Sequence, residues 1–399
     1  MLTYFPTPYP NEWWYSVLCR YHVRSGYQKH QTTMKELFGG DTSISLAAVF
    51  PNNTIRKVLA QLPLDLSDVV CRHTLFPYYL RFYSTSEKRQ VLDRLSRGEN
   101  VTITGIRKYA DVQNWHPRYC PQCAESDRQQ YGEPYWHIDH QIPLMTVCPI
   151  HGCQIVSVAS LSLREMGHSF IPLSQIALQN ENTVEFAPWE EKLSRILCEY
   201  FTLPLSIGMT DGYNNIAIAL ANMGYESIQS SSPHTVLQTK KLYRDLQSFF
   251  GSKTVEKIIG TERNANVINR LGKWTMKTPE RYALLQCFAG LESKDVFGDI
   301  LPSQREIALR EMSCNGQTYT KKQIMAQLQV TSCQLDTLLR KYQIRPFWRG
   351  TDKQEKTHRL QFQLSESEYA AYKRALAASG MRYDSDFIKQ CLMDVIRRH

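Results

Sequence analysis

The chain has 399 residues, of which 42% are hydrophobic and 21% are charged, and its formal net charge is +9. This length supports roughly two to four domains, and no segment approaches the run of about 18 apolar residues that spans a bilayer, which argues against a membrane protein or a membrane partner. Residues 321–399 hold 15 Lys and Arg against 8 Asp and Glu, a balance of +7, which leaves +2 for the rest. A basic C-terminal fifth on a nearly neutral body predicts contact with nucleic-acid phosphates, the alternative being a solvated face that only aids solubility.

The first 110 residues predict several short helices. After the proline-rich residues 5–10, Asn11 can cap a helix whose apolar residues recur every three or four positions from Trp14 to Tyr21, and Gly26 ends it. Shorter helical patterns cover residues 32–38, 43–50 and 54–62. Helix-turn-helix domains are built from this arrangement, but the near-neutral charge favours docking to a protein over binding DNA.

Two matched motifs carry the strongest chemical signal, Cys120-Pro-Gln-Cys123 and Cys148-Pro-Ile-His151, with 24 residues between them. Each motif directs two ligands at one point, and two such turns complete the tetrahedral shell that Zn²⁺ prefers in structural sites. Because all four positions are filled by protein, no place remains for an activated water. We therefore predict one structural zinc ion and not a catalytic one.

Other readings of these residues remain open. Cys153 competes with His151 as the fourth ligand, and His137 and His140 are more distant candidates. A disulfide within the first motif would need an oxidising compartment, whereas the start of the chain has neither the basic region nor the apolar region of an export signal. The remaining cysteines are scattered, so we expect a soluble protein in a reducing cytoplasm.

The middle of the chain is again helical. Residues 156–163 resemble a short extended piece, and residues 187–300 show a helical pattern with an apolar face on its first helix, formed by Trp189, Leu193, Ile196 and Leu197. Residues 230–233 read as a loop.

No catalytic motif accompanies this pattern, so we do not expect an enzyme. The remote alternative is a nuclease or transposase. It would need carboxylates such as Asp139, Asp211 and Asp299 to converge on Mg²⁺, which the sequence does not indicate.

Two helical patterns in the tail, residues 321–328 and 331–342, predict a helix-turn-helix. Thr331 or Ser332 would cap the second helix. The residues expected at DNA bases or phosphates are Lys321, Lys322, Ser332, Gln334, Arg340, Lys341, Arg345 and Arg349, with Asp336, Thr337 and Trp348 beside them. The alternative is one more helical pair packed on the preceding domain.

The last 42 or so residues predict a strand followed by two helices. Residues 359–364 alternate between polar and apolar, Ser365 and Glu368 form a capping box, one helix runs to Gly380, and a second begins near Asp384. In a ribbon-helix-helix unit, paired strands from two copies enter the major groove, and here Arg359, Gln361 and Gln363 would point at base edges. Such a unit requires a homodimer, and the alternative is a winged domain completed within one chain.

Several ordered motifs lie within residues 4–155: Phe5-Pro-Thr-Pro-Tyr9 with Glu12 and Tyr15-Ser16, His73-Thr-Leu-Phe-Pro77, Arg118-Tyr-Cys120-Pro-Gln-Cys123, Tyr131-Gly-Glu133, Tyr135-Trp136 and Cys148-Pro-Ile-His151-Gly152. Together they resemble the TniQ/TnsD family of target-site selectors of bacterial transposons, more closely its TnsD branch. The resemblance is weaker through the helical middle.

The resemblance implies a non-enzymatic bacterial protein that binds a specific attachment-site DNA and recruits the AAA+ ATPase TnsC through its N-terminal segment. The family's alternative role is an adaptor between an RNA-guided CRISPR Cascade complex and TnsC. Cys120, Cys123, Cys148 and His151 match the family's zinc ligands. The basic tail, and the lack of the second zinc knuckle that Cascade-bound members often carry, favour the DNA-binding role.

The complete prediction is a mainly α protein with five modules. They are an N-terminal helical, helix-turn-helix-like TniQ-type domain (1–115), a zinc-knuckle module (116–160), a helical domain (161–300), a helix-turn-helix (301–350) and a C-terminal strand-helix-helix module of ribbon-helix-helix or winged type (351–399).

Overall fold

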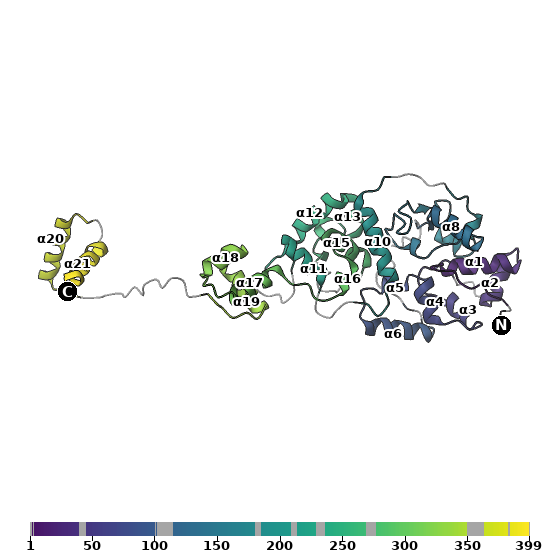
Figure 1. The fold of residues 1–399 in the computed structure, drawn as a ribbon, viewed down its shortest axis with the longest axis horizontal. Coiled ribbons are helices and arrows are strands. Elements are labelled where there is room, and N and C mark those ends of the chain that lie inside the picture. Colours follow the sequence, from purple (N-terminus) through teal and green to yellow (C-terminus); the bar gives the residue numbers. More distant parts are fainter. Residues whose placement is uncertain are drawn as a thin grey trace. The chain divides into compact units, whose positions relative to one another are not determined.

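The computed structural model describes residues 2, 4–39, 45–99, 101, 115–179, 185–208, 214–228, 236–268, 277–348, 363–381 and 384–398. They fall into two compact units, the first formed by Met1–Gln317 with Met325–Pro346 and the second by Thr318–Ile324 with Phe347–His399. Regular structure in both units is almost entirely helical (Figure 1), which confirms the predicted mainly α class. Among the described helices, none combines the length and apolarity needed to cross a membrane.

Helix α1 (Trp14–Ser25) buries every side chain from Trp14 to His22. It ends, as predicted, at Gly26, whose φ of 72° is a left-handed conformation that favours glycine. The prediction that Asn11 caps this helix is wrong. Asn11 has a φ of 52°, and its carbonyl accepts a hydrogen bond from the Ile138 N–H, so the chain turns there to meet a distant segment.

Five further helices follow α1 in the N-terminal region: α2 (His30–Phe38), α3 (Asn53–Leu59), α4 (Leu66–His73), α5 (Phe76–Tyr79) and α6 (Thr85–Ser96). The predicted helix over residues 43–50 is wrong in its described part, because residues 45–50 are irregular. The backbone there bonds to other segments, with the Leu46 N–H donating to the Gly167 carbonyl at 2.9 Å and Val49 accepting from the Leu75 N–H at 2.7 Å. Tertiary partners therefore replace the local hydrogen bonds of a helix.

A small module follows, held by one two-stranded antiparallel ribbon. Strand β1 (Arg118–Tyr119) pairs with β2 (Val156–Ser157), and between them lie α8 (Pro121–Tyr131) and the short helix η1 (Asp139–Gln141). The predicted extended piece at 156–163 is confirmed only at its start, because the strand ends at Ser157 and α9 (Leu163–Met166) begins six residues later. The short helix η2 (Leu173–Gln175) ends the segment.

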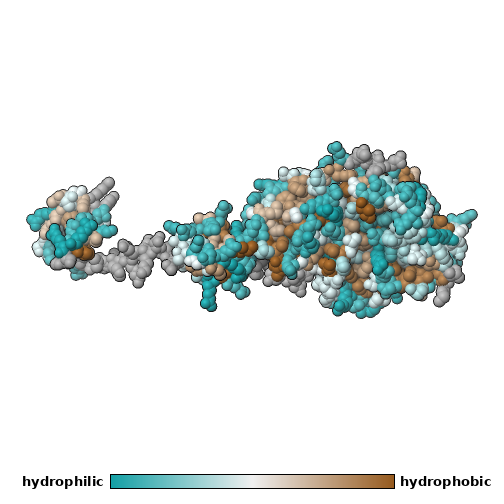
Figure 2. Space-filling model, in the orientation of Figure 1, coloured by the Kyte–Doolittle hydropathy of each residue, from teal (hydrophilic) through white to brown (hydrophobic). Residues whose placement is uncertain are grey.

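The helical middle is confirmed. It comprises α10 (Pro188–Thr202), α11 (Asn215–Leu220), η3 (Ala221–Tyr225), α12 (Thr239–Phe250), α13 (Ser252–Ile258), η4 (Glu262–Asn264), α15 (Pro279–Ala289) and α16 (Ser293–Phe297). Helix α17 (Gln304–Cys314) follows beyond residue 300. On α10, Leu193, Ile196 and Leu197 are buried as predicted, while Trp189 is half-buried. The predicted loop at 230–233 lies outside the described residues. On the face drawn in Figure 2, hydrophilic and hydrophobic side chains are interspersed over these helices.

Arg81 joins the N-terminal region to this helical middle. Its side chain is 0% exposed, and its guanidinium donates to the carbonyls of Tyr200, Leu203, Pro204 and Ile207 at 2.5–3.0 Å. These carbonyls lie at and just beyond the C-terminal end of α10, where a cation is also favoured by the helix dipole. Burial lowers the pKa of Arg81 to about 10, which still leaves it charged at neutral pH.

In the tail, α18 (Lys321–Leu328) and α19 (Ser332–Lys341) occupy the two predicted patterns. Thr331 caps α19 in a capping box with Gln334, and the turn before it contains Gln329 at a φ of 53°. The last two helices are α20 (Glu366–Ser379), which has the predicted Ser365/Glu368 capping box and ends at Gly380, and α21 (Asp384–Arg398). Residues 359–362 of the predicted strand lie outside the described residues, and Gln363 and Leu364 are irregular.

Candidate metal centre

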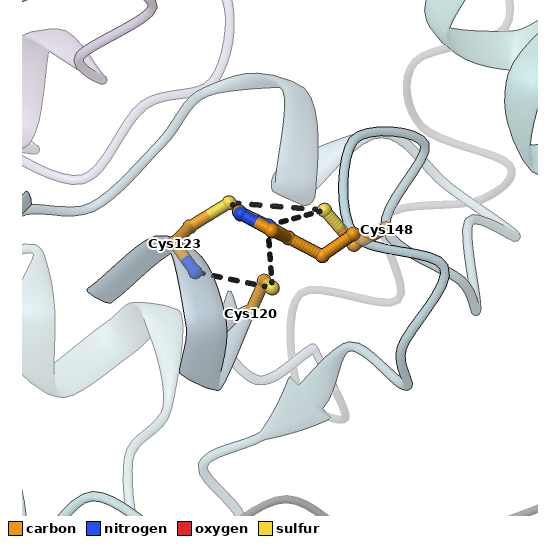
Figure 3. Close-up of side chains that lie close together, drawn as sticks. Cys120, Cys123 and Cys148 are labelled. Atoms are coloured by element: carbon orange, nitrogen blue, oxygen red, sulfur yellow. Dashed lines mark hydrogen bonds between the residues drawn. The ribbon is translucent and has the colours of Figure 1, made fainter. Parts of the chain in front are cut away.

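Cys120, Cys123, Cys148 and His151 converge, with their four ligand atoms all within 4.8 Å of one another. Figure 3 shows the sulfur atoms of the three cysteines turned toward a common point. Cys120 is the N-cap of α8, and its sulfur accepts the Cys123 backbone N–H at 3.3 Å. Pro121 at the first helical position needs no hydrogen-bond partner, and its fixed φ is suited to this tight turn.

The second pair of ligands comes from a narrow hairpin-like loop. The Cys148 N–H donates to the Cys153 carbonyl and the Gly152 N–H donates to the Cys148 carbonyl, both at 2.8 Å. Gly152 adopts a φ of 64°, which reverses the chain directly after His151. The loop therefore presents His151 and Cys148 to the same point as the α8 knuckle.

The distances within the quartet fit tetrahedral coordination. His151 Nδ1 lies 3.6, 3.2 and 3.7 Å from the sulfurs of Cys120, Cys123 and Cys148, and the Cys123 and Cys148 sulfurs are 3.7 Å apart. Around a tetrahedral zinc ion, bonds of about 2.3 Å to sulfur and about 2.0 Å to nitrogen give edges of about 3.8 Å between sulfurs and about 3.5 Å between sulfur and nitrogen. This Cys₃His set could hold a metal ion.

The competing ligands fit less well. Cys153 Sγ lies 3.2 Å from Cys120 Sγ, closer than a tetrahedral edge, and it is not one of the four converging residues. His140 Nε2 lies 3.7 Å from Cys123 Sγ and 4.0 Å from Cys148 Sγ, whereas His151 approaches all three sulfurs. The geometry therefore favours His151 as the fourth ligand.

His140, which the sequence made a more distant candidate ligand, nevertheless lies against the quartet. It is 1% exposed, its Nδ1 has no hydrogen-bond partner, and with His137 and Asp139 it forms a second buried group of ligand atoms. His137 Nε2 pairs with Asp127 at 2.8 Å. Burial would lower the pKa of His137, but the hydrogen bond with Asp127 and the charge of Asp139 hold it above its ordinary value.

The three thiols differ in acidity. Hydrogen bonds with Cys120 and Cys148, together with burial, hold the pKa of Cys123 above its usual range. Hydrogen bonds from Cys120 and Cys123 hold the pKa of Cys148 well below its usual range. Because zinc is bound by thiolates, a bound divalent cation would favour loss of the protons from these thiols.

A buried charge network ties the N-terminal segment to this module. Glu12 Oε2 accepts from Arg20 Nη1 at 2.7 Å and from the Tyr9 N–H at 2.9 Å, and Arg20 Nε donates to Glu133 at 3.0 Å. Arg24 pairs with the same Glu133 oxygen at 2.6 Å, and the Arg20 guanidinium lies 3.5 Å from the Tyr9 ring centre. Burial raises the pKa of Glu12 to about 7 despite Arg20 beside it.

Backbone pairing reinforces this link. Glu12 and His137 form an antiparallel bridge, the Trp13 N–H donates to the Trp136 carbonyl at 2.8 Å, and His73 Nδ1 lies 2.7 Å from the Glu12 carbonyl. Motifs separated by more than 100 residues in the chain therefore meet beside the metal quartet. Sequence reasoning identified these motifs singly but missed Arg20, whose only sign was a charge within an apolar helical stripe.

The residues predicted to contact DNA lie in different environments. Ser332, Arg340 and Arg345 are exposed, as are Lys322 and Gln363. Lys321 Nζ lies 5.0 Å from the Trp348 ring centre. Arg349, Arg359 and Gln361 lie outside the described residues.

Several polar residues of α19 have partners within the protein, among them Arg340, whose Nε donates to the Asp336 carbonyl at 3.2 Å. Gln334 Oε1 accepts the Thr331 N–H at 2.9 Å, and Lys341 Nζ lies 3.4 Å from Glu226 Oε1. The expectation that Thr337 faces a groove is wrong, because Thr337 is 8% exposed and its hydroxyl donates to the Cys333 carbonyl at 2.9 Å.

Comparison with known proteins places the N-terminal segment. Residues 3–155, which include the whole quartet, match the TniQ family model. The transposon Tn7 transposition protein TnsD of Escherichia coli is 28% identical over 158 residues, which are 38% of this chain and 31% of that relative. The match thus spans about a third of the relative's length. Residues 3–155 are therefore similar to the TniQ family, of which TnsD is a matched relative.

Proposed function

We propose that this protein selects target sites for a bacterial transposon, binding attachment-site double-stranded DNA and recruiting the AAA+ ATPase TnsC. The observation that carries the proposal is the TniQ match over residues 3–155. The printed name of the Tn7 relative, a transposition protein, supports it. We assign ATPase recruitment to residues 1–115, metal binding to 116–160, a connecting helical domain to 161–300, and DNA binding to 301–350 and 351–399.

The quartet binds one structural Zn²⁺ in this proposal. Its three cysteines are at most 4% exposed, and four protein ligands leave no open position for substrate or water. The ion would pin the α8 knuckle to the Cys148–His151 loop. Residues 136–138, which pair with the N-terminal segment, lie between those two ligand pairs, so the metal would stabilise the TniQ region as a whole.

DNA recognition is assigned to the tail, with α19 in the role of reading helix. Ser332 lies at its N-terminal end and Arg340 near its C-terminal end, both exposed, and Arg345 follows in the next segment. Arg is the residue that most often recognises guanine or clamps phosphate. Lys341 contributes less to DNA binding in this proposal, because its ammonium group already forms an ion pair with Glu226.

The protein acts without catalysing DNA cleavage or joining in this proposal. In the described part of the chain, the clusters able to hold a metal are the Cys₃His quartet and the His137/Asp139/His140 group, and neither brings two carboxylates together. Two-metal nucleases and polymerases depend on several such carboxylates. Purified protein that cuts DNA with Mg²⁺ alone would contradict this assignment.

The test is selection of bound fragments from a genomic library by the zinc-loaded full chain at about 150 mM salt, near physiological ionic strength. A DNA-reading selector should enrich one sequence, with specific binding about 10³-fold or more above non-specific binding. Arg340→Ala should lose this enrichment, whereas Arg164→Ala, which removes an exposed arginine outside the tail, should retain it. Sequence-blind, salt-sensitive binding would contradict the proposal and favour an adaptor whose target is chosen by a Cascade complex.

A further inference from the structure

The second unit contains a helical hairpin whose apolar face is not covered by the described part of that unit. None of the described side chains of α20 and α21 is buried. Tyr372 and Phe387 join the two helices, with ring centres 5.8 Å apart. Beyond that contact the exposed fractions of large apolar side chains are high, at 40% for Leu392, 57% for Val395 and 58% for Ile396.

Six apolar residues of α21 form one continuous stripe: Phe387, Ile388, Cys391, Leu392, Val395 and Ile396. Residues spaced in this way share one face of a helix. The stripe runs along α21, which has 15 residues and is about 22 Å long. Because removing apolar surface from water is favourable, a face of this kind marks an interaction site.

The charges at the two ends of α21 indicate that its partner is a second copy. Asp384 and Asp386 lie in the first turn, and Arg397 and Arg398 lie in the last. Asp384 and Arg398 lie on the side of the stripe, because they are seven residues before and after Cys391, whereas Asp386 and Arg397 lie on the opposite side. Asp384 also pairs with Lys373 of α20 at 3.2 Å. In an antiparallel pair related by a two-fold axis, the acidic end of each helix lies against the basic end of the other, and one patch serves both copies.

We propose that the chain dimerises through this face, with α21 packed antiparallel against α21 of a second copy. Cys391 lies midway between Asp384 and Arg398, so the two-fold axis passes close to it. The dimer requires no DNA, and its test is therefore separate from that of target selection. Where target selection also holds, two copies of the reading helix imply a recognition sequence with two-fold symmetry.

Sedimentation equilibrium of the zinc-loaded full chain tests the proposal. The wild type should have twice the monomer mass of 46.3 kDa. The double variant Val395→Lys/Ile396→Lys should have the mass of one chain. Both side chains are more than half exposed, so their replacement leaves the Tyr372–Phe387 contact intact. The matched control is Gln390→Lys/Met393→Lys, which adds the same charge on the opposite face of α21 and should remain dimeric. Unchanged helical circular dichroism of the double variant would show that it remains folded.

A short thiol-reactive cross-linker tests the antiparallel arrangement. With the exposed Cys314 and Cys333 replaced by serine, the chain should yield a covalent dimer that Cys391→Ser abolishes. A single mass for the wild type throughout the micromolar range, or a double mass for Val395→Lys/Ile396→Lys, would overturn the proposed interface. A dimer that does not cross-link at Cys391 would overturn the antiparallel pairing.

Discussion

Glu280 provides a quantitative test of the packing between the N-terminal region and the helical middle. It lies in the first turn of α15, is 1% exposed, and accepts a hydrogen bond from the Tyr78 hydroxyl of α5 at 3.0 Å. Burial raises its pKa from 4.5 to about 7, because a carboxylate loses its hydration there. The perturbation is Glu280→Gln, which retains a carbonyl oxygen for Tyr78 and cannot ionise.

The direction of the pH dependence of stability follows from proton binding to Glu280 in the folded and unfolded states. Between pH 4.5 and about 7 the folded protein retains a proton on Glu280 that the unfolded chain releases, so its contribution to stability is present below pH 4.5 and is lost as the pH rises through about 7. One pKa unit corresponds to about 1.4 kcal/mol, so the shift corresponds to about 3 kcal/mol. Glu280→Gln should therefore be more stable than the wild type at pH 8, by up to about 3 kcal/mol, and similar to it near pH 4.5.

Urea unfolding of the zinc-loaded protein, followed by tryptophan fluorescence at several pH values between 4.5 and 8.5, measures this difference. Glu256→Gln, at an exposed position of α13, is the matched control and should show no such pH-dependent gain. A Glu280→Gln variant whose stability relative to the wild type does not change with pH would refute the assignment of Glu280 as a buried, desolvated carboxyl.

Three further predictions concern the metal, the interdomain arginine and the tail. Cys123→Ser should abolish binding of one zinc per chain, read by metal analysis and by loss of the Co²⁺–thiolate charge-transfer band, whereas His140→Gln should retain a four-coordinate Co²⁺ spectrum if His151 is the fourth ligand. Arg81→Met should lower the free energy of unfolding by about 2–4 kcal/mol, because buried carbonyls at the end of α10 lose their donor; an unchanged urea midpoint would contradict the role given to this side chain. Thr331→Ala should lower the free energy of unfolding by about 1 kcal/mol, because it removes the cap of α19. A loss of DNA-binding free energy larger than this loss of stability would support α19 as the reading helix.

The metal quartet could be predicted because its information is local. Two ligands three residues apart on a tight turn point in one direction wherever the turn lies, so spacing alone brings Cys120 to Cys123 and Cys148 to His151. Caps are equally local, which is why the Ser365/Glu368 capping box and the Gly380 stop were found from sequence. His140 could not be assigned in this way, because its approach to Cys123 depends on how η1 packs against α8.

Structural features that depend on partners distant in the chain could not be predicted from the sequence. Residues 45–50 have a helical pattern, yet their backbone bonds to Gly167 and Leu75, and local propensity does not report such partners. The Arg20 network likewise requires Glu12 and Glu133 to meet across more than 100 residues. Thr337 was placed on the outer face of α19 by its residue type, whereas its hydroxyl bonds back to the helix and lets it pack inward.

The central claim is that this protein bridges a DNA target to the transposition ATPase, and the most direct test is assembly of the three components. Immobilised DNA carrying the enriched sequence is incubated with purified TnsC and ATP, with or without the zinc-loaded full chain. We expect TnsC to be retained on this DNA only when the protein is present, and the DNA-binding variant Arg340→Ala not to retain it. Retention of TnsC without the protein, or equal retention on DNA lacking the sequence, would contradict the account.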